Sequence, residues 1–593
     1  MTYSTDLRVP YLGLPVKTGQ KKTTLEIFAD NEKILELEIA DLQGDFCNYY
    51  CWLRLPECIG KTLTLKGELS DAFFGLVQQT EHYDHEPLTR PLLHFTAERG
   101  WLNDPNGMVY QDGVYHLYFQ YNPADSEWGN MSWGHAESTD LLHFRQADTV
   151  LLPDENGPAF SGSGLVNERG LLGLPKDALI FFYTAAGGLN PWSRNVSSDT
   201  ASTAKNVAAE AAISQTVEDA AAEGATSQTV EDAAAEAAIS QTVENAVEST
   251  FTQRIAVSTD GGQTLNKLPK EAVGVIAPES RDPQVFWHEA SGAYVMALWI
   301  EGEEMAVLRS DDLQNWEMTD RFTLPGAFEC PNLFCLPVPE EDDATSSDRD
   351  LPVKPSEAYG MQWILLAADG SYYFGDFDGY RFVSDGVRRK VYLNELPYAA
   401  QIYNGISDRK VLVPWLRTRN EGRLYTGSMG LPRELGLLRK NGELLLEMLP
   451  VREYEKAKKK LASFAMIHEK TFLTAPEGKF PFEAKSDRIS FEITEEAVTE
   501  LVLMPGKEGK LRIDFFGQTL TVEEDRLCLS GAEEQTVLPE VFAELHLLID
   551  RQIIEVYGNE GTLTAYYETG SDTLTGKIAI SGFSGTLDVY QWK

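Results

Sequence analysis

Short runs of alternating apolar and polar residues, separated by Gly, Asp and Asn, cover most of the chain. The first group lies between Lys21 and Val77 and contains TTLEIFA, KILELEIA, NYYCWLRL and KTLTLKGEL. An apolar residue at every second position is typical of a strand that buries one face. We therefore predict a small β-sandwich-like domain over residues 1–85, followed by a polar connector that ends at Pro91.

The same alternation continues from His94 to about Val451, and sustained helical apolar stripes do not interrupt it. Turn signals punctuate this region. Long β-rich regions with closely spaced turns are typical of a sandwich, a barrel or a propeller. We expect one all-β domain over residues 90–453, with turns at Asp112-Gly113, Asp260-Gly261, Asp369-Gly370 and Asp378-Gly379.

A charged stretch, residues 454–461 (YEKAKKKL), predicts a helical linker after this domain. Alternation resumes beyond Ala462 in RISFEIT, ELVLMPG, KLRIDFF and QIIEVYG. The pattern again has the period of half-buried strands. We predict a C-terminal β-sandwich over residues 462–593.

Residues 190–249 do not follow this pattern, because they are rich in Ala, Glu, Ser and Thr. SQTVED begins at Ser214 and Ser227, and SQTVEN begins at Ser240, so the repeat recurs every 13 residues. Thirteen residues are about 3.6 helical turns, which would not align equivalent side chains on one helix face. We interpret the segment as an acidic, solvated insertion.

Composition narrows the choice of partners. The chain has 51 Lys and Arg against 91 Asp and Glu, a formal net charge of -40. This charge argues against nucleic acid and anionic membranes, because phosphate contacts require cations. The N-terminus lacks the pattern of a signal peptide and apolar runs are short, so we expect a cytoplasmic protein. The spacing of the six cysteines matches no zinc pattern, which favours reduced thiols and no metal.

Candidate carboxylates stand in distinctive settings. Asp104 follows Asn103 in a turn-forming NDPNG segment, where hydrogen bonding would keep the acid ionised. Glu329 stands between apolar and sulfur-bearing neighbours, a setting that raises a carboxyl pKa as a general acid requires. Arg281 next to Asp282 suggests an ion pair, which would lower the pKa of the aspartate. Each segment alone also fits a purely structural turn or surface pair.

Six motifs occur in one order: WLNDPNG (101–107), FQYNP (119–123), WGNMSWGHA (128–136), FSGSG (160–164), RDPQVFW (281–287) and FECPNLF (328–334). Together they resemble glycoside hydrolase family 32, the invertase, inulinase and levanase family, from His94 to Lys593. This resemblance implies a five-bladed β-propeller followed by a β-sandwich. The N-terminal stretch looks like the extra domain that precedes the propeller in some bacterial levanases.

The resemblance also implies roles for individual residues. Asp104 would be the nucleophile, Glu329 the general acid/base, and Asp282 would hold sugar hydroxyls at the transition state. The reaction needs no metal or organic cofactor. The residues implied to contact the fructosyl unit are Asn103, Gln120, Trp128, Ser161 and Arg281.

The implied reaction is retaining hydrolysis of β-fructofuranosidic bonds in levan, inulin or sucrose, with levan favoured. Retention requires two carboxyl groups about 5–5.5 Å apart. The alternatives are an intracellular sucrose or sucrose-phosphate hydrolase, fructosyl transfer to a sugar hydroxyl, and a fructan-binding protein without catalysis. Many family members carry an acidic residue before a Tyr-Ala pair, where this chain has Glu395-Leu396-Pro397-Tyr398-Ala399. Strand counting along the blades predicts that the 190–249 insertion emerges at the rim of the site.

Overall fold

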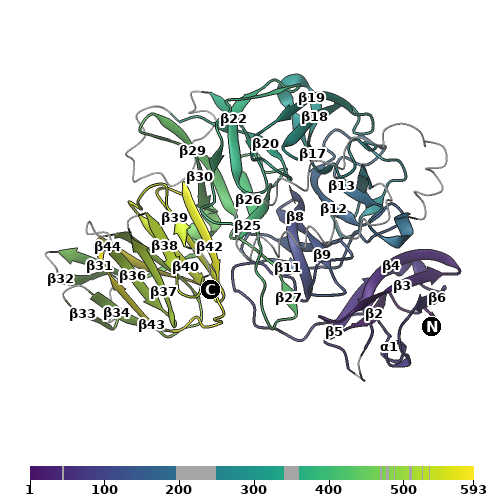
Figure 1. The fold of residues 1–593 in the computed structure, drawn as a ribbon, viewed down its shortest axis with the longest axis horizontal. Coiled ribbons are helices and arrows are strands. Elements are labelled where there is room, and N and C mark those ends of the chain that lie inside the picture. Colours follow the sequence, from purple (N-terminus) through teal and green to yellow (C-terminus); the bar gives the residue numbers. More distant parts are fainter. Residues whose placement is uncertain are drawn as a thin grey trace, which may run out of the picture.

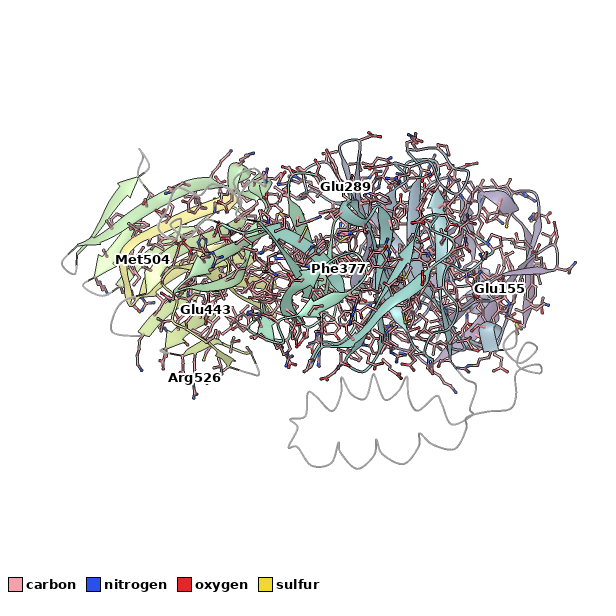
Figure 2. All side chains as sticks on the ribbon, turned by 90° about the horizontal axis from the view of Figure 1, so that it is seen from above. Glu155, Glu289, Phe377, Glu443, Met504 and Arg526 are labelled. Carbon is pink, nitrogen blue, oxygen red and sulfur yellow. The ribbon has the colours of Figure 1, made fainter. Side chains whose placement is uncertain are left out.

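The structure, a computed structural model, describes residues 1–194, 249–339 and 360–593, apart from residues 43, 45, 468–469, 476–479, 486–487, 506–509, 524 and 533–534. Strands make up 55% of it and helices 4%, which confirms the all-β prediction. The N-terminal and C-terminal sheets lie at opposite ends of the molecule, with the remaining sheets between them (Figures 1 and 2). Most of the predicted insertion lies outside the described residues. Within the described part, no helix is long and apolar enough to cross a membrane.

Two antiparallel sheets form the N-terminal part, and their apolar faces share one core. Leu25, Ile27 and Leu37 point into this core from the predicted alternating strands. The first sheet has the order β1-β6-β3-β4, with β1 Thr2–Asp6, β3 Lys22–Ala29, β4 Glu32–Ala40 and β6 Thr62–Gly67. The second has the order β5-β2-β7, with β2 Tyr11–Val16, β5 Tyr49–Arg54 and β7 Gln78–Thr80. Two short helices, η1 Pro56–Cys58 and α1 Asp71–Gly75, complete this part.

Five antiparallel sheets then follow one another along the chain, from β8 to β30. The first contains β8 Gly100–Gln111, β9 Val114–Asn122, β10 Ser132–Ser138, β11 Arg145–Gln146 and, parallel to β8, β27 Tyr425–Thr426. The second contains β12 Ala159–Val166, β13 Leu179–Gly187, β14 Thr250–Ser258 and β15 Asn266–Lys267. The third contains β16 Arg281–His288, β17 Ala293–Glu301, β18 Glu304–Ser310 and β19 Glu317–Thr323, with η3 Glu289–Ser291 between β16 and β17.

The fourth sheet contains β20 Asn332–Pro337, β21 Met361–Leu366, β22 Ser371–Phe377, β23 Phe382–Ser384 and β24 Arg389–Lys390. The fifth contains β25 Pro397–Ile402, β26 Lys410–Leu416, β28 Ser428–Met429, β29 Arg433–Lys440 and β30 Glu443–Pro450. In the first four sheets the main strands lie side by side in chain order, and the fifth keeps this order with β28 attached to β26.

The first strands of these five sheets contact one another in sequence. β12 contacts both β8 and β16. The Gln284 side chain in β16 accepts a hydrogen bond from the Leu333 N–H in β20, 3.1 Å away. The Asn332 side chain donates to the Ala400 carbonyl in β25 at 2.8 Å. β25 in turn contacts β8, so contacts between first strands also link the fifth sheet to the first.

Two seven-stranded sheets form the C-terminal part and pack against a shared apolar core. The helix α5, Arg452–Ala457, precedes them; it is shorter than the predicted 454–461 linker, because β31 already begins at Lys459. One sheet contains β31 Lys459–Ile467, β32 Lys470–Ala475, β35 Val498–Pro505, β40 Leu545–Asp550, β41 Ile553–Gly558, β42 Leu563–Glu568 and β44 Phe583–Trp592. The other contains β33 Phe482–Lys485, β34 Arg488–Ile493, β36 Lys510–Phe515, β37 Gln518–Glu523, β38 Arg526–Leu529, β39 Thr536–Val537 and β43 Gly576–Ser581.

A fully buried ion cluster joins the segment before β8 to the C-terminal sheets. His94 Nδ1 lies 2.9 Å from Asp550 Oδ2, and His94 Nε2 lies 2.9 Å from Glu555 Oε1. Arg433 of the fifth sheet also contacts Glu555. Burial alone would lower the pKa of His94, but its hydrogen bonds to the two carboxylates outweigh burial and raise the pKa to about 9.

Replacing His94 by Gln should destabilise the protein most at mildly acidic and neutral pH. The folded pKa of about 9 exceeds the unfolded value of 6.5, so the stabilisation is complete below pH 6.5 and is lost as pH rises through 9. We expect a loss of roughly 3–5 kcal/mol at pH 6.5, the cost of breaking a buried ion pair. Denaturant unfolding at pH 6.5 and 9.5 measures it, with the exposed His143→Gln as control. A loss of equal size at both pH values would contradict the charge argument.

Candidate active site

Several of the predicted site residues lie where the first strands of the sheets break register. Asp104 lies in the break of β8, Ser161 in that of β12 and Asp282 in that of β16. β25 has its break at Ala399. Such bulges bend a strand and redirect its side chains. The prediction of a turn at NDPNG is therefore wrong, because Asp104 belongs to a bulged strand that continues to Gln111.

The backbone at the site adopts conformations that non-glycine residues rarely take. The φ angles are 65° at Asp282, 49° at Glu329, 43° at Cys330 and 45° at Ala399. A left-handed non-glycine residue costs on the order of 1–3 kcal/mol and persists only where its surroundings hold it. Their concentration around the candidate carboxylates is typical of an active site.

Asp104 is held by two side-chain hydrogen bonds. Ser161 Oγ donates to Asp104 Oδ2 at 2.6 Å, and Asn103 Nδ2 donates to Asp104 Oδ1 at 3.1 Å. Trp101 Nε1 in turn donates to Asn103 Oδ1 at 2.8 Å, which fixes the amide. Burial raises the pKa of Asp104 to about 6; the charge of Glu329 adds to this rise, whereas the hydrogen bonds from Ser161 and Asn103 oppose it. The hydrogen-bonded setting expected for Asp104 is present.

Asp282 does not form the predicted ion pair with Arg281. Its Oδ2 instead accepts a hydrogen bond from the Cys330 N–H at 3.1 Å, and the side chain of Arg281 turns to Glu329. Burial, together with the charges of Glu329 and Asp104, raises the pKa of Asp282 to about 7, although the charge of Arg281 and the hydrogen bond from Cys330 oppose the rise. The expectation of a lowered pKa was wrong, because the register break of β16 at Asp282 directs the guanidinium of Arg281 to Glu329.

Glu329 has polar rather than apolar neighbours, which corrects the prediction from its sequence context. Arg281 Nε donates to Glu329 Oε1 at 3.0 Å, and Arg281 Nη2 contacts the same oxygen. Tyr398 Oη donates to Glu329 Oε2 at 2.8 Å. The guanidinium lies 4.1 Å from the ring centroid of Trp299, which holds it by a cation–π contact.

One thiol connects the three carboxylates. Cys330 Sγ lies 3.4 Å from Asp282 Oδ2 and 3.9 Å from Asp104 Oδ2, and Cys330 directly follows Glu329. Burial and the surrounding negative charges raise the pKa of this thiol, so it is a neutral donor. The structure thus brings Asp104, Asp282 and Glu329 together.

The other predicted residues lie around this centre. Gln120 is buried at the end of β9, and its side-chain amide donates to the Ala159 carbonyl in the break of β12 at 3.0 Å. Trp128, in the loop after β9, is 40% exposed with its ring edge-on to Phe160 at 6.2 Å. Phe160 directly precedes Ser161, which contacts Asp104, and an exposed indole provides an apolar surface for one face of a sugar ring.

Sequence reasoning missed two contributors. Tyr398 lies in the ELPYAA segment that departs from the family pattern, and its contact with Glu329 gives that segment a place in the site. Thr184 Oγ1 accepts the Asp282 N–H at 3.2 Å, three residues before β13 ends. Nothing in the sequence around Thr184 marks it. This contact brings the end of β13, which pairs with the start of β14, to the carboxylates; the insertion between the two strands is outside the described residues.

One group among the described residues has metal-ligand types close together: His116, His135 and Glu137, whose ligand atoms lie within 4.8 Å of one another. His116 Nδ1 and His135 Nε2 are 3.1 Å apart and hydrogen bond to each other. Burial lowers the pKa of His116 to about 4 and also lowers that of His135, so both rings are neutral. Their mutual hydrogen bond gives the pair a packing role between β9 and β10.

Comparisons with known proteins agree with this geometry. The family described as "Glycosyl hydrolases family 32 N-terminal domain" matches residues 94–447. An extracellular exo-inulinase of Aspergillus ficuum is 26% identical over 565 residues, covering 86% of this chain and 94% of that protein. A levanase of Bacillus subtilis is 25% identical over 530 residues, covering 83% and 68%. The solved structure of a glycoside hydrolase family 32 protein from Bifidobacterium adolescentis superposes with a TM-score of 0.60 at 16% identity, covering 100% of this chain and 99% of that one.

Replacing Asp282 by Asn should stabilise the protein increasingly as pH rises. The folded pKa of about 7 lies above the model-peptide value of 3.8, so the native acid favours folding at low pH and loses this contribution as pH rises through 7. Asn cannot ionise, so the variant avoids a cost of about 1.4 kcal/mol per pH unit between the two values.

We expect the free energy of unfolding of Asp282→Asn, relative to that of the wild type, to increase by on the order of 2 kcal/mol between pH 5 and pH 7. Thermal or urea unfolding across this range measures it. Asp376→Asn, at an exposed position in β22, is the matched control and should show no such trend. An Asp282→Asn advantage independent of pH would contradict the raised pKa.

Proposed function

The chain belongs to glycosyl hydrolase family 32, and we propose that it is a β-fructosidase that hydrolyses β-fructofuranosidic bonds in fructans, with levan favoured. The observation that carries this proposal is the convergence of Asp104, Asp282 and Glu329 around Cys330. The similarity to an inulinase and a levanase over most of the chain supports the substrate class. The N-terminal sheets, which lie beyond the matched family region, favour a polymeric substrate over sucrose.

The proposed mechanism is a double displacement with retention. Asp104 attacks the anomeric carbon of the fructosyl unit while Glu329 protonates the departing glycosidic oxygen. Water, deprotonated by the same glutamate, then releases the fructosyl unit from Asp104. Ser161 and Asn103 orient the nucleophile, and their hydrogen bonds favour its ionised form against the effect of burial.

The roles of Glu329 and Asp282 follow from position rather than from pKa. The side chain of Glu329 is 18% exposed between Arg281 and Tyr398, whereas Asp282 lies beneath Cys330 and is 6% exposed. A general acid must reach a leaving group that departs toward solvent, which suits Glu329. A buried carboxylate with fixed backbone contacts suits an acceptor for the hydroxyls of the fructosyl ring.

We also propose the division of the chain that the sequence suggested: an N-terminal β domain over residues 1–85, a five-bladed β-propeller over 90–453 and a C-terminal β-sandwich over 462–593. Five successive sheets and the contacts between their first strands support the propeller. The parallel pairing of β27 with β8, which attaches a late segment to the first sheet, supports its closure.

Leaving-group dependence tests the assignment of the acid. Glu329→Gln should lower kcat/KM for sucrose by about 10²–10⁴-fold, because a poor leaving group needs protonation. For an aryl β-fructofuranoside with an acidic phenol, the loss should be at least roughly tenfold smaller. Asp282→Asn should impair both substrates equally.

The outcome that would exchange the two roles is a leaving-group-dependent loss in Asp282→Asn and a uniform loss in Glu329→Gln. Full activity of Asp104→Ala on both substrates would overturn the mechanism, whereas a wild-type protein that binds fructan and hydrolyses neither substrate would favour the fructan-binding alternative. Steady-state kinetics with both substrates distinguishes these outcomes, and circular dichroism of each variant checks that it is folded.

The pH dependence of kcat/KM tests the nucleophile. Asp104 must be ionised to attack, so we expect the acidic limb near pH 6. Ser161→Ala removes a hydrogen bond to the carboxylate, which raises the pKa of Asp104 and moves the limb to higher pH. Ser163→Ala is the control, because Ser163 Oγ donates to the Pro283 carbonyl rather than to Asp104. A limb that stays in place in Ser161→Ala would contradict the assignment of Asp104.

Product analysis on levan, inulin and sucrose in parallel tests the substrate. We expect release of fructose with the highest kcat/KM on levan. A preference for sucrose, or for sucrose phosphate, would favour the sucrose-hydrolase alternative, and products longer than the substrate would indicate transfer.

A further inference from the structure

A cavity of about 550 Å³ lies where the N-terminal sheets meet the first of the five central sheets. Its volume falls within the range of small-molecule sites, about 300–1,000 Å³. Protein interiors and tight interfaces are usually filled by side chains. The cavity is separate from the three carboxylates, none of which lines it.

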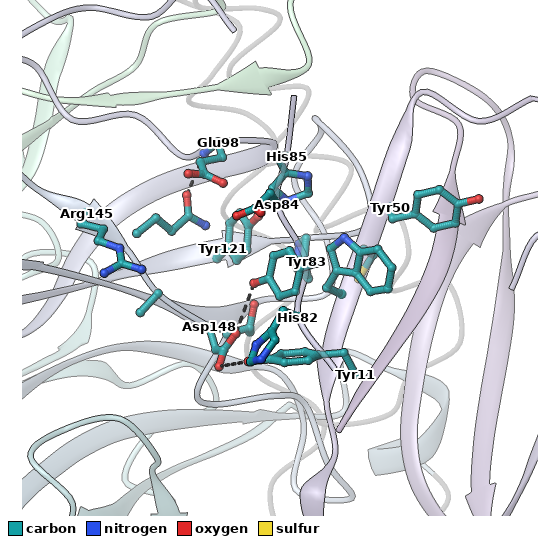
Figure 3. Close-up of a pocket in the computed structure, with 16 residues that line it drawn as sticks. Tyr11, Tyr50, His82, Tyr83, Asp84, His85, Glu98, Tyr121, Arg145 and Asp148 are labelled. Atoms are coloured by element: carbon teal, nitrogen blue, oxygen red, sulfur yellow. Dashed lines mark hydrogen bonds between the residues drawn. The ribbon is translucent and has the colours of Figure 1, made fainter. Parts of the chain in front are cut away.

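One wall of the cavity is aromatic and comes from the N-terminal part. Trp52 of β5 and Tyr83 of the connector stack with ring centroids 5.3 Å apart and planes at 16°. Tyr11 of β2 meets Tyr83 edge-on at 5.0 Å. Figure 3 shows Tyr11, Tyr50 and Tyr83 together on this side. Trp52 also stacks with Tyr50, with ring centroids 5.4 Å apart, so the rings form a rigid and partly exposed aromatic wall.

The opposite wall is polar and comes from the first central sheet. Glu98 and Arg145 lie across the cavity from Tyr50 and Tyr83 (Figure 3), whereas Asp148 is in contact with the aromatic wall. Asp148 accepts hydrogen bonds from Tyr11 Oη at 3.0 Å and from Tyr83 Oη at 3.2 Å, which fixes the orientation of both rings. A cation and carboxylates facing a rigid aromatic surface can bind hydroxyl groups on one side of a ligand and C–H groups on the other.

We propose that this cavity is a second carbohydrate-binding site, which holds a short stretch of a fructan chain away from the catalytic centre. A sugar ring has C–H faces that pack on aromatic rings and hydroxyls that bond to carboxylates and guanidinium groups. The identification of the sugar as a fructan rests on the proposed function. The cavity therefore anchors a polymer whose other part reaches Asp104.

The chain path connects the two sites. Tyr121 and Pro123 line the cavity, and the same segment contains Gln120 and Trp128, which contact Ala159 and Phe160 next to Ser161 of the catalytic centre. The loop between β9 and β10 is bound to the N-terminal part, since Asn130 Nδ2 donates a hydrogen bond to the Glu38 carbonyl at 2.8 Å. Two sites on one polymer raise the local concentration of substrate at the second site without a new catalytic contact.

Binding and kinetics of cavity variants test this proposal. Trp52→Ala removes an aromatic wall residue, and the exposed Arg145→Ala removes a polar one with little risk to folding. The control is Tyr380→Ala, at an aromatic residue that is 49% exposed and does not line the cavity. Affinity electrophoresis in levan-containing gels measures binding, and kcat/KM on levan and sucrose measures turnover.

We expect both cavity variants to bind levan roughly tenfold more weakly, as for loss of one well-packed contact, and to lose kcat/KM on levan but not on sucrose. Unchanged levan retardation in both folded variants would overturn the second site, as would equal retardation of the wild type by dextran. If the protein hydrolysed neither levan nor sucrose, the proposed function would fail while the electrophoresis still reported on the cavity.

Discussion

The contact between Arg281 and Glu329 is the interaction on which the chemistry of the site depends. Asp104, Asp282 and Glu329 are packed around one thiol, and burial together with the charge of Glu329 favours protonation of the two aspartates. Arg281 places a cation at Glu329 and is itself held over the ring of Trp299. The other two carboxylates are left with raised pKa values of about 6 and about 7. The geometry of the site thus places the guanidinium of Arg281 against Glu329 and not against the two aspartates.

The surrounding architecture holds this unfavourable arrangement in place. Contacts between successive first strands fix the relative positions of β8, β12 and β16, which carry Asp104, Ser161 and Asp282. The C-terminal sheets are fastened to the segment before β8 by the buried His94 cluster. The N-terminal sheets hold the loop after β9 through Asn130. Each part of the chain therefore stabilises a segment that leads directly into the site.

Much of the fold could be predicted from local pattern. The strands around Leu25 and Leu37 follow directly from alternation, since a half-buried strand requires it. The ordered motifs likewise identified the carboxylates that the fold brings together. The partners of individual side chains could not be predicted. The position of Arg281 next to Asp282 suggested an ion pair between them, whereas a strand bulge turns the guanidinium to Glu329. Thr184 contacts Asp282, which is 98 positions away in the sequence, and His94 contacts Asp550, which is 456 positions away. Contacts at such separations leave no signal in the local sequence.

The register breaks at the start of the central strands have a further consequence. Asp104, Ser161 and Asp282 lie on different sheets, and each occupies a bulge of its own strand. A substitution within one bulge can change one functional group while the strands that contact the adjoining sheets keep their register. The site is in this sense modular: its reactivity and its preference for one sugar or another can diverge sheet by sheet, on a scaffold that stays the same.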